Sequence, residues 1–401
     1  MGELAEKRTD MRAALTLLPL LLLAFPALGQ LPEGFLGEEG VLTKEEVKEG
    51  WIALFDGHSL YGWRPQEAAN FRVENGSIKV DSGEQALLCT TTQFSDYVFK
   101  VDFRSDPETN SGIFFRTSPK PKDVTKSAYE LNIAPQSNNF PTGSLVRRTK
   151  VEGKGGDDAW HSYEVVMDGG HVTIKLDGEA ISDYTDPDPT GRGFIGLQHN
   201  SGRVEFKNVK LRPLKAKMIF NGEDLDGWKE YPDMASSASV SPEGFLKLKG
   251  GKGMLESSGH YGDFILQFDA ITHAAHSNSG VFFRSIPGEE MNGYESQLQN
   301  GHPNPKELMP RTGSLVRRKL ARTMAAADFE WFTETIIAEG PHLAVWVNGY
   351  LVADFVDRRK PDKNPRRGLR TEAGSIILQG HDANTEVSFR DIRVVEMKPR
   401  F

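Results

Sequence analysis

The chain has 401 residues, of which 38% are hydrophobic, and its 48 Lys and Arg against 56 Asp and Glu give a net charge of −8. This length and composition suit one large or two medium globular domains and argue against disorder and against an all-membrane fold. Because the basic residues are scattered and outnumbered, the sequence lacks the positive field that binds a phosphate backbone, and we exclude nucleic acid as a primary partner.

Residues 1–29 are predicted to be a secretory signal peptide. An apolar run from Ala13 to Ala27 is broken by Pro19 and Pro26, and small residues precede Gln30 as they do at a cleavage site. A membrane anchor is the alternative, but the run is shorter than the ~20 residues that span a bilayer. We therefore expect a secreted or periplasmic protein that begins near Gln30 and has no stable membrane span once the signal is removed.

Residues 30–49 form an N-terminal segment with the one clear helix signal of the chain. Thr43 opens the run to Lys48, and Glu46 stands three residues after Thr43, which is the pattern of a capping box. Beyond this segment, 40 Gly and 22 Pro favour many turns between short strands. The single cysteine, Cys89, cannot form an intrachain disulfide, so stability must come from burial.

An internal repeat organises the rest of the chain. The run from Leu54 to Trp63 returns in similar form from Ile219 to Trp228, and the seven residues from Thr142 to Arg148 return unchanged from Thr312 to Arg318. The order of the other landmarks repeats as well. We expect two homologous domains that pack together, at residues 50–213 and 217–398.

Within each copy the hydrophobic period is two, which indicates β-strands. In the first copy, Tyr97, Phe99, Val101 and Phe103 alternate with other residues along a half-buried strand. Hairpin turns are expected at Asp168-Gly169, Asp177-Gly178, Glu339-Gly340 and Asn348-Gly349, where glycine permits a positive φ. The predicted fold is all-β, with each copy a two-sheet sandwich of jelly-roll type.

The repeated motifs resemble a known family. They are a Phe-Asp/Asn-Gly-x-x-Leu-x-Gly-Trp opening, an Asn-Ser-Gly-Ile/Val-Phe-Phe-Arg strand, a Tyr-Glu strand and a closing Leu-Gln…His, as at 378–381. The chain resembles the 3-keto-disaccharide hydrolase domain family twice over, across nearly the whole of the two repeats. The resemblance implies a concanavalin-like sandwich, usually exported by bacteria, that acts on glycosides whose C3 hydroxyl is oxidised to a ketone.

The candidate catalytic residues are the charged ones within these motifs. A 3-ketone acidifies the C2 proton, so a carboxylate could remove it while an arginine or a metal stabilises the enediolate, and the glycosidic oxygen would then leave. We expect each glutamate to pair with the arginine of the preceding strand. The candidates are Glu295, Arg284 and His381 in the second copy, and Glu130 and Arg116 in the first.

Polar residues beside these positions are candidates for substrate binding. They are Gln297, Gln379, Asn278 and Arg317 in the second copy, and Asn110 and Arg147 in the first. One arginine of each Arg-Arg pair should face the groove and the other solvent. The first copy departs from the pattern at Asn132, which replaces Gln297, and at His199, which follows Gln198 directly. Both differences favour the second copy as the active one.

Plainer interpretations stay open beside these. A buried Arg–Glu pair has a structural explanation equal to the catalytic one. The tryptophans at the strand ends, Trp63, Trp228, Trp160 and Trp331, are more typical of core than of sugar contacts. The basic stretch from Arg358 to Arg370 is interpreted as a solvated loop rather than a binding arm, although Arg366-Arg367-Gly368 resembles the family's pattern in the second copy. At the level of the whole protein, a non-catalytic tandem module that binds carbohydrate is the rival to an enzyme, since the fold alone cannot decide.

Cofactor signals are weak. His273, His276, Asp56 and Asp224 offer metal ligands without a strict spacing, so a divalent cation such as calcium stays open and no cofactor is certain. Serine-hydrolase, phosphate-loop and zinc motifs are missing from the sequence. Carbohydrate is the expected partner, and the oligomeric state stays open.

Overall fold

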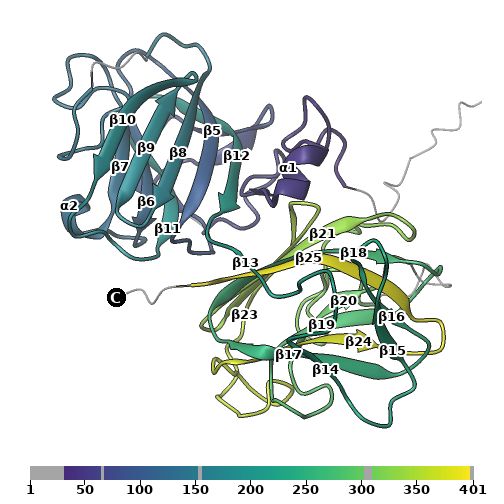
Figure 1. Cartoon of the computed structure of the whole chain (residues 1–401). Helices are drawn as coiled ribbons and strands as arrows, with labels where there is room; N and C mark the ends of the chain where they lie inside the picture. Colours follow the sequence, from purple (N-terminus) through teal and green to yellow (C-terminus); the bar gives the residue numbers. More distant parts are fainter. Residues whose placement is uncertain (1–30, 65–66, 152–155, 302–308, 398–401) are drawn as a thin grey trace, which may run out of the picture.

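Two β-sandwiches stand next to one another, with a short helix between them (Figure 1). The structure is a computed structural model that describes residues 31–64, 67–151, 156–301 and 309–397. The all-β prediction with two tandem sandwiches is confirmed. The predicted signal peptide lies outside the described residues. No helix within them is long and apolar enough to cross a membrane.

The first sandwich contains two antiparallel sheets. Its strands are β1 (Ile52–Ala53), β2 (Arg72–Glu74), β3 (Ser77–Val80), β4 (Ala86–Cys89), β5 (Tyr97–Ser105), β6 (Asn110–Thr117), β7 (Tyr129–Ile133), β8 (His161–Asp168), β9 (His171–Leu176), β10 (Glu179–Thr185), β11 (Phe194–Ser201) and β12 (Val204–Pro213). The large sheet has the order β10-β9-β8-β5-β12-β3-β2, with β1 paired to β12. The small sheet has the order β4-β11-β6-β7.

The second sandwich repeats this arrangement. Its strands are β13 (Lys217–Met218), β14 (Trp228–Glu230), β15 (Ser237–Val240), β16 (Leu246–Lys249), β17 (Gly253–Tyr261), β18 (Phe264–Thr272), β19 (Ser279–Ser285), β20 (Tyr294–Leu298), β21 (Phe332–Glu339), β22 (His342–Val347), β23 (Tyr350–Val356), β24 (Gly374–Gly380) and β25 (Glu386–Glu396). The large sheet has the order β15-β16-β25-β18-β21-β22-β23, with β13 paired to β25. The small sheet has the order β14-β17-β24-β19-β20.

The core of each copy lies between its two sheets. The alternation predicted on β5 is confirmed, because Tyr97, Phe99, Val101 and Phe103 all point into the core and are at most 1% exposed. On β18 both faces are buried, since Ile265 joins the hydrophobic cluster of the first copy while its neighbours fill the second core. The half-buried pattern expected from the sequence therefore fails at the contact between the two copies.

The predicted hairpin turns are confirmed. At Asp177-Gly178 and Asn348-Gly349, both turn residues have positive φ, which suits the twist of the flanking strands. The sequence analysis missed a one-turn helix, α2 (Val124–Ser127). Two of the four tryptophans expected in the core are there: Trp63 and Trp228 are buried, and each donates its indole N–H to a backbone carbonyl nine residues earlier in the chain.

The N-terminal segment lies between the copies. Its helix, α1 (Lys44–Glu49), has the predicted capping box, in which Thr43 and Glu46 each accept a hydrogen bond from the other's backbone. Phe35 and Leu42, although they precede the first copy in sequence, are buried in the hydrophobic cluster of the second.

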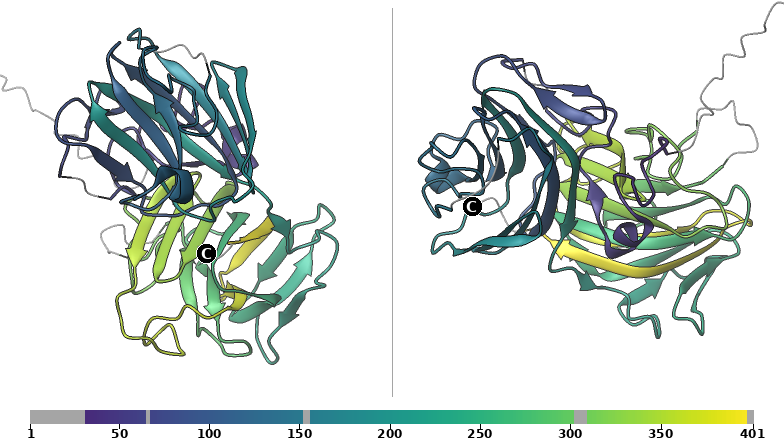
Figure 2. Two further views of the ribbon diagram at one scale, coloured as in Figure 1. Left: turned by 90° about the vertical axis from the view of Figure 1, so that its left-hand side faces the viewer. Right: turned by 90° about the horizontal axis from the view of Figure 1, so that it is seen from above.

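Strands β21 to β23 of the second copy lie beside the first sandwich (Figure 2). Across this contact, Trp346 donates its indole N–H to the carbonyl of Ala53 at 3.0 Å, and Arg322 pairs with Asp56 at 2.8 Å. The expectation that the two copies pack together is confirmed.

Candidate active site

The polar candidates of the second copy gather on the outer face of its small sheet. On strand β19, which lies next to the edge strand β20, Gly280 lies directly between Gln297 on β20 and Gln379 on β24, and Phe282 lies between Glu295 and Ile377. Because side chains alternate along a strand, these residues share one face. The structure therefore brings together Glu295, Gln297 and Gln379, as the sequence analysis expected.

Gly280 leaves a small hollow in this face, which is the space of its missing side chain. A Cβ at this position would lie 3.1 Å from Oε1 of Glu295 and 3.3 Å from Oε1 of Gln379, so the space that a side chain would fill is bordered by two acceptor oxygens. Gln379 is 1% exposed, and among the described residues its Oε1 has no hydrogen-bond partner. A buried acceptor without a donor is costly, and here it faces the hollow where a ligand hydroxyl could donate to it.

Burial and nearby positive charges act in opposite directions on the pKa of the Glu295 carboxylate. Arg366 donates to Oε2 of Glu295 at 3.0 Å and is itself held by the carbonyl of Met291 at 2.7 Å. Burial raises the pKa of Glu295, and the charges of Arg366, His381 and Arg317 oppose that rise. A carboxylate with a raised pKa beside a fixed guanidinium is suited to accept a proton and to have the resulting negative charge stabilised.

The loop that carries Arg366 corrects an interpretation made from the sequence. The stretch from Arg358 to Arg370 is a docked loop rather than a solvated one. Arg359 pairs with Asp357 and donates to the loop carbonyls of Pro365 and Gly368, and Arg318 donates to the carbonyl of Arg366. Arg318 is therefore partly buried beneath the loop, and its expected solvent orientation is wrong. The sequence analysis did not select Arg366, because proline and charge mark a loop without showing where it docks.

The expected pairing of Arg284 with Glu295 is wrong. Arg284 is 0% exposed, and its guanidinium pairs with Asp263 at 2.9 Å and donates to three backbone carbonyls. In the first copy, Arg116 pairs with Asp96 instead of Glu130 and makes the same set of carbonyl contacts.

The backbone explains this difference. Arg116 and Arg284 have φ values of 49° and 47°, and a register shift lies beside each. This left-handed conformation breaks the alternation on which the predicted pairing depended. Both arginines therefore anchor loops and do not reach the outer face. The repeated acid before a strand, Asp96 in one copy and Asp263 in the other, was the sequence signal that could have identified their partners.

The first copy has the same framework with different side chains. Gly112 lies between Asn132 on β7 and Gln198 on β11, and Gln198 donates to Glu130 at 3.2 Å. Burial raises the pKa of Glu130, while the Gln198 hydrogen bond and the charge of Arg147 oppose the rise. Gln198 thus occupies the place of Gln379. The expectation that the side-chain alternation of this strand differs from that of its counterpart in the second copy is wrong.

The structure also shows where the two residues after Gln198 lie. His199 is 2% exposed, and its partner across the β6 ladder is Ser111, on the inner side of the strand. Asn200, one residue further, stands where the second copy has His381 and lines a cavity together with Glu130 and Asn110.

The remaining candidates of the second copy border its site. His381 is exposed and pairs with Asp382 at 3.0 Å. Asn278 accepts a hydrogen bond from Gln297 at 2.7 Å. Arg317 and its counterpart Arg147 are both exposed and lie close enough to the glutamate of their own copy to affect its pKa. Their positions support a role for these residues at the rim of the polar sheet face in their own copy.

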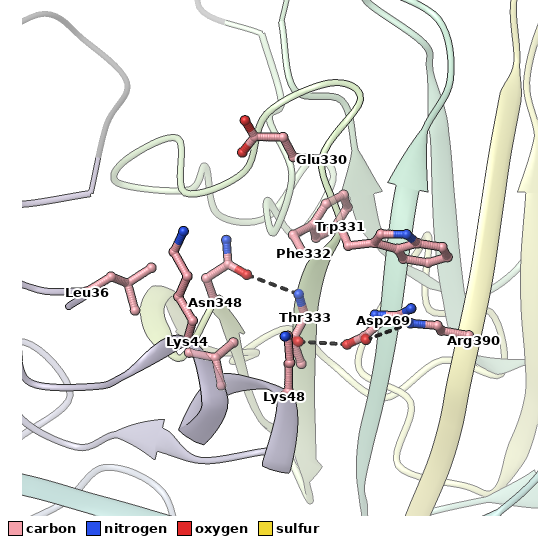
Figure 3. Close-up of a pocket in the computed structure, with 11 residues that line it drawn as sticks. Leu36, Lys44, Lys48, Asp269, Glu330, Trp331, Phe332, Thr333, Asn348 and Arg390 are labelled. Atoms are coloured by element: carbon pink, nitrogen blue, oxygen red, sulfur yellow. Dashed lines mark hydrogen bonds and ion pairs between the residues drawn. The ribbon is translucent and has the colours of Figure 1, made fainter. Parts of the chain in front are cut away.

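The two other landmark tryptophans lie on the large sheets, on the opposite side of each sandwich. Both Trp160 and Trp331 are half-buried under cationic side chains rather than in the core, and Arg390 stands 4.2 Å from the ring of Trp331. Trp331 also lines a cavity of about 200 Å³ between the N-terminal segment and the second sandwich, where Lys44 and Lys48 reach over it (Figure 3). In the described part of the chain, no cluster of three or more His, Cys, Asp and Glu could hold a metal ion.

Comparison with known families and structures adds to this description. A family model described as the 3-keto-alpha-glucoside-1,2-lyase-like domain matches residues 50–212 and again residues 215–395. No curated protein matches the sequence.

Among solved structures, the chain is similar to a candidate glycosyl hydrolase from Parabacteroides distasonis, with 22% identity over 43% of this chain and 98% of that one, at a TM-score of 0.39. It is also similar to the carbohydrate-binding module CBM66 from Bacillus subtilis, with 18% identity over 37% of this chain and 94% of that one, at a TM-score of 0.30.

Proposed function

Because the chain belongs, through both of its repeats, to the 3-keto-alpha-glucoside-1,2-lyase-like domain family, we propose that it is an exported enzyme that cleaves 3-keto-glycosides at the Glu295 face of its second sandwich. The family match establishes a glycoside-acting or carbohydrate-binding β-sandwich. The 3-keto specificity, the mechanism and the location outside the cytoplasm are part of the proposal.

The proposed first step is removal of the C2 proton of the sugar by Glu295. The ketone at C3 makes this proton acidic, and the electrons of the C–H bond move into a C2–C3 double bond as negative charge develops on the C3 oxygen. Arg366, which is already fixed beside Glu295, is the cation best placed on this face to stabilise that charge.

In the second step the enediolate expels the glycosidic oxygen. The C3 ketone re-forms, a double bond forms between C1 and C2, and the bond from C1 to the glycosidic oxygen breaks with its electron pair on oxygen. His381, exposed at the rim and paired with Asp382, would supply the proton that the leaving oxygen needs. Addition of water at C1 would complete a hydrolysis, whereas release of the unsaturated sugar would make the enzyme a lyase.

The observation that carries the proposal is the hollow over Gly280. It combines a carboxylate of raised pKa, an ion-paired guanidinium and a buried amide oxygen that lacks a donor, all on one sheet face. Perturbed ionisable groups beside unsatisfied polar groups favour a functional site over a structural one.

Turnover of a chromogenic 3-keto-glucoside tests the proposal, with the unoxidised glucoside as control and with and without a chelator. We expect Glu295→Gln to lower the rate by a factor of about 10² to 10⁴, because an amide of nearly the same shape is not a base. Glu130→Gln should have the smaller effect. A melting temperature on each sample separates loss of catalysis from loss of folding.

If Glu130→Gln removed activity and Glu295→Gln did not, the site would belong to the first copy. If the wild type bound sugars but turned over no 3-keto-glucoside, the rival interpretation, a tandem carbohydrate-binding module, would replace the enzyme.

A further inference from the structure

The first copy presents an open groove on the same sheet face. Two adjoining cavities of about 330 and 430 Å³ lie over its small sheet and share Gln85, Phe114, Pro121 and Gln198 as lining. We propose that this groove is a second saccharide site, which binds neutral sugars in two adjoining subsites and does not cleave them. The inference goes beyond the proposed function, which concerns the second copy alone.

One of the two cavities is lined mainly by polar residues, beside Phe114, Pro121, Phe140 and Val146. It is bordered by the carboxylate of Glu130 and by the amides of Asn110, Asn132, Gln198 and Asn200. Gln198 is 6% exposed, and in the described residues its Oε1 has no hydrogen-bond partner. A Cβ on Gly112 would lie 3.5 Å from this oxygen, so the acceptor borders the hollow of the first copy as its counterpart does in the second.

This chemistry selects hydroxyl groups. An unpartnered amide oxygen beside a carboxylate needs a donor, and a sugar hydroxyl can donate to one oxygen while it accepts from a neighbouring amide. A phosphate or carboxylate would place acceptor against acceptor here, which disfavours an acidic ligand. Lys120 and Arg147, the cations nearest the groove, are exposed at its rim.

The other cavity is lined mainly by apolar residues, beside Gln85, Lys120 and Gln198. Its floor is Leu87 and Phe114, which lie on the outer face of β4 and β6, and its wall contains Ala68, Pro119 and Pro121. The C–H face of a pyranose packs on surfaces of this kind, while its hydroxyls reach the polar cavity next to it. The two cavities together therefore suit a disaccharide, with one ring in each.

The groove lacks the groups that the second copy brings to catalysis. Asn200 replaces His381, and an amide cannot supply the proton for a leaving group at neutral pH. Within the described residues no arginine forms an ion pair with Glu130, because the segment between Asp186 and Gly193 is too short to form the loop that carries Arg366. The first copy keeps the elements for recognition and loses those for chemistry.

Isothermal titration of the full chain with an unoxidised α-linked glucose disaccharide tests this inference, in buffer with and without a chelator. We expect saturable binding that Gln198→Leu weakens at least tenfold. Gly112→Ala, which fills the hollow with one methyl group, should weaken binding in the same direction and serves if the leucine variant does not fold. The same substitution at Gln379 locates the site, since it alters the matched position of the second copy.

The inference is wrong if the wild type does not bind the disaccharide, or if Gln379→Leu removes binding and Gln198→Leu does not. Loss of binding on chelation would overturn the direct hydroxyl contact in favour of a cation held by Glu130. If Glu130→Gln lowered turnover of a 3-keto-glucoside as much as Glu295→Gln does, the first copy would be catalytic and the inference would fail. Binding without any turnover would support the inference and remove only the proposed function.

Discussion

The two sandwiches share one sheet and differ in what covers it. Each has a glycine on the strand next to the edge of its small sheet, with a glutamine on one neighbouring strand and a glutamate on the other. In the second copy the loop from Arg358 to Arg370 crosses to this face and places Arg366 on the glutamate, whereas the first copy has an open groove there. If the proposed function is right, a loop between two strands decides which copy is catalytic, while the sheet is common to both.

The buried arginines are the feature in which the copies agree most closely, and removing them should have the largest effect. Arg284→Met leaves three carbonyls without their donor and removes one partner of Asp263, which keeps its ion pair with Arg192, so we expect a loss of about 3–5 kcal/mol in the free energy of unfolding, and a loss of similar size for Arg116→Met. Denaturant unfolding measures both, with the exposed Arg367→Met as control. A large loss of stability for only one of the two variants would show that the two arginines are not equivalent.

A core position at which the copies differ should have the next largest effect. Tyr163 in the first copy corresponds to Glu334 in the second. Tyr163 donates its hydroxyl to the carbonyl of Asn132, whereas Glu334 is fully buried, and neither of its oxygens finds a partner in the described part of the chain. Burial raises the pKa of Glu334 to about 8.

The consequence is a loss of stability as pH rises. Below the ordinary carboxyl pKa the folded and unfolded states are both protonated, and stability then falls between that value and about pH 8 as only the unfolded state ionises. At roughly 1.4 kcal/mol for each pKa unit, the loss reaches a few kcal/mol. We expect Glu334→Gln to melt close to the wild type at pH 5 and above it at pH 8.5. A constant difference across this range would contradict the prediction.

Removal of Arg366 should have the smallest of these effects and would sharpen the comparison at the site itself. Its charge opposes the rise that burial causes in the pKa of Glu295, so Arg366→Gln should raise that pKa further. Because the proposed reaction needs an ionised carboxylate, the acid limb of kcat/KM should move to higher pH, and because the C3 oxygen also loses its cation, the rate should fall by about tenfold at every pH. Arg367→Gln, exposed and adjacent, is the matched control. An unchanged pH profile would show that Arg366 only anchors its loop.

The sequence predicted the fold well because the patterns that determine it are local, and because the internal repeat presents most of them twice. Alternation, hairpin turns and the capping box at Thr43 depend on neighbouring residues, and the repeat showed each landmark again. It also indicated that Glu295, Gln297 and Gln379 share a face. The prediction failed for Arg284, because this residue has a left-handed backbone conformation that reverses the alternation of side chains along the strand. The sequence pattern does not show this reversal. It failed for Arg366, because the docking of a long loop depends on contacts with distant strands.

The N-terminal segment gives the chain an unusual order of assembly. Residues 31–49 are made before either sandwich, yet Phe35 and Leu42 are buried in the hydrophobic cluster of the second sandwich, and the amide of Ala53 donates to the carbonyl of Gly349. These contacts cannot form until nearly the whole chain has been synthesised. Phe35 packs against Tyr350 of β23, so the hydrophobic side chains of this segment stay uncovered until that strand has been made. In the folded protein the two copies are thus held together in part by a segment that precedes both of them in the sequence.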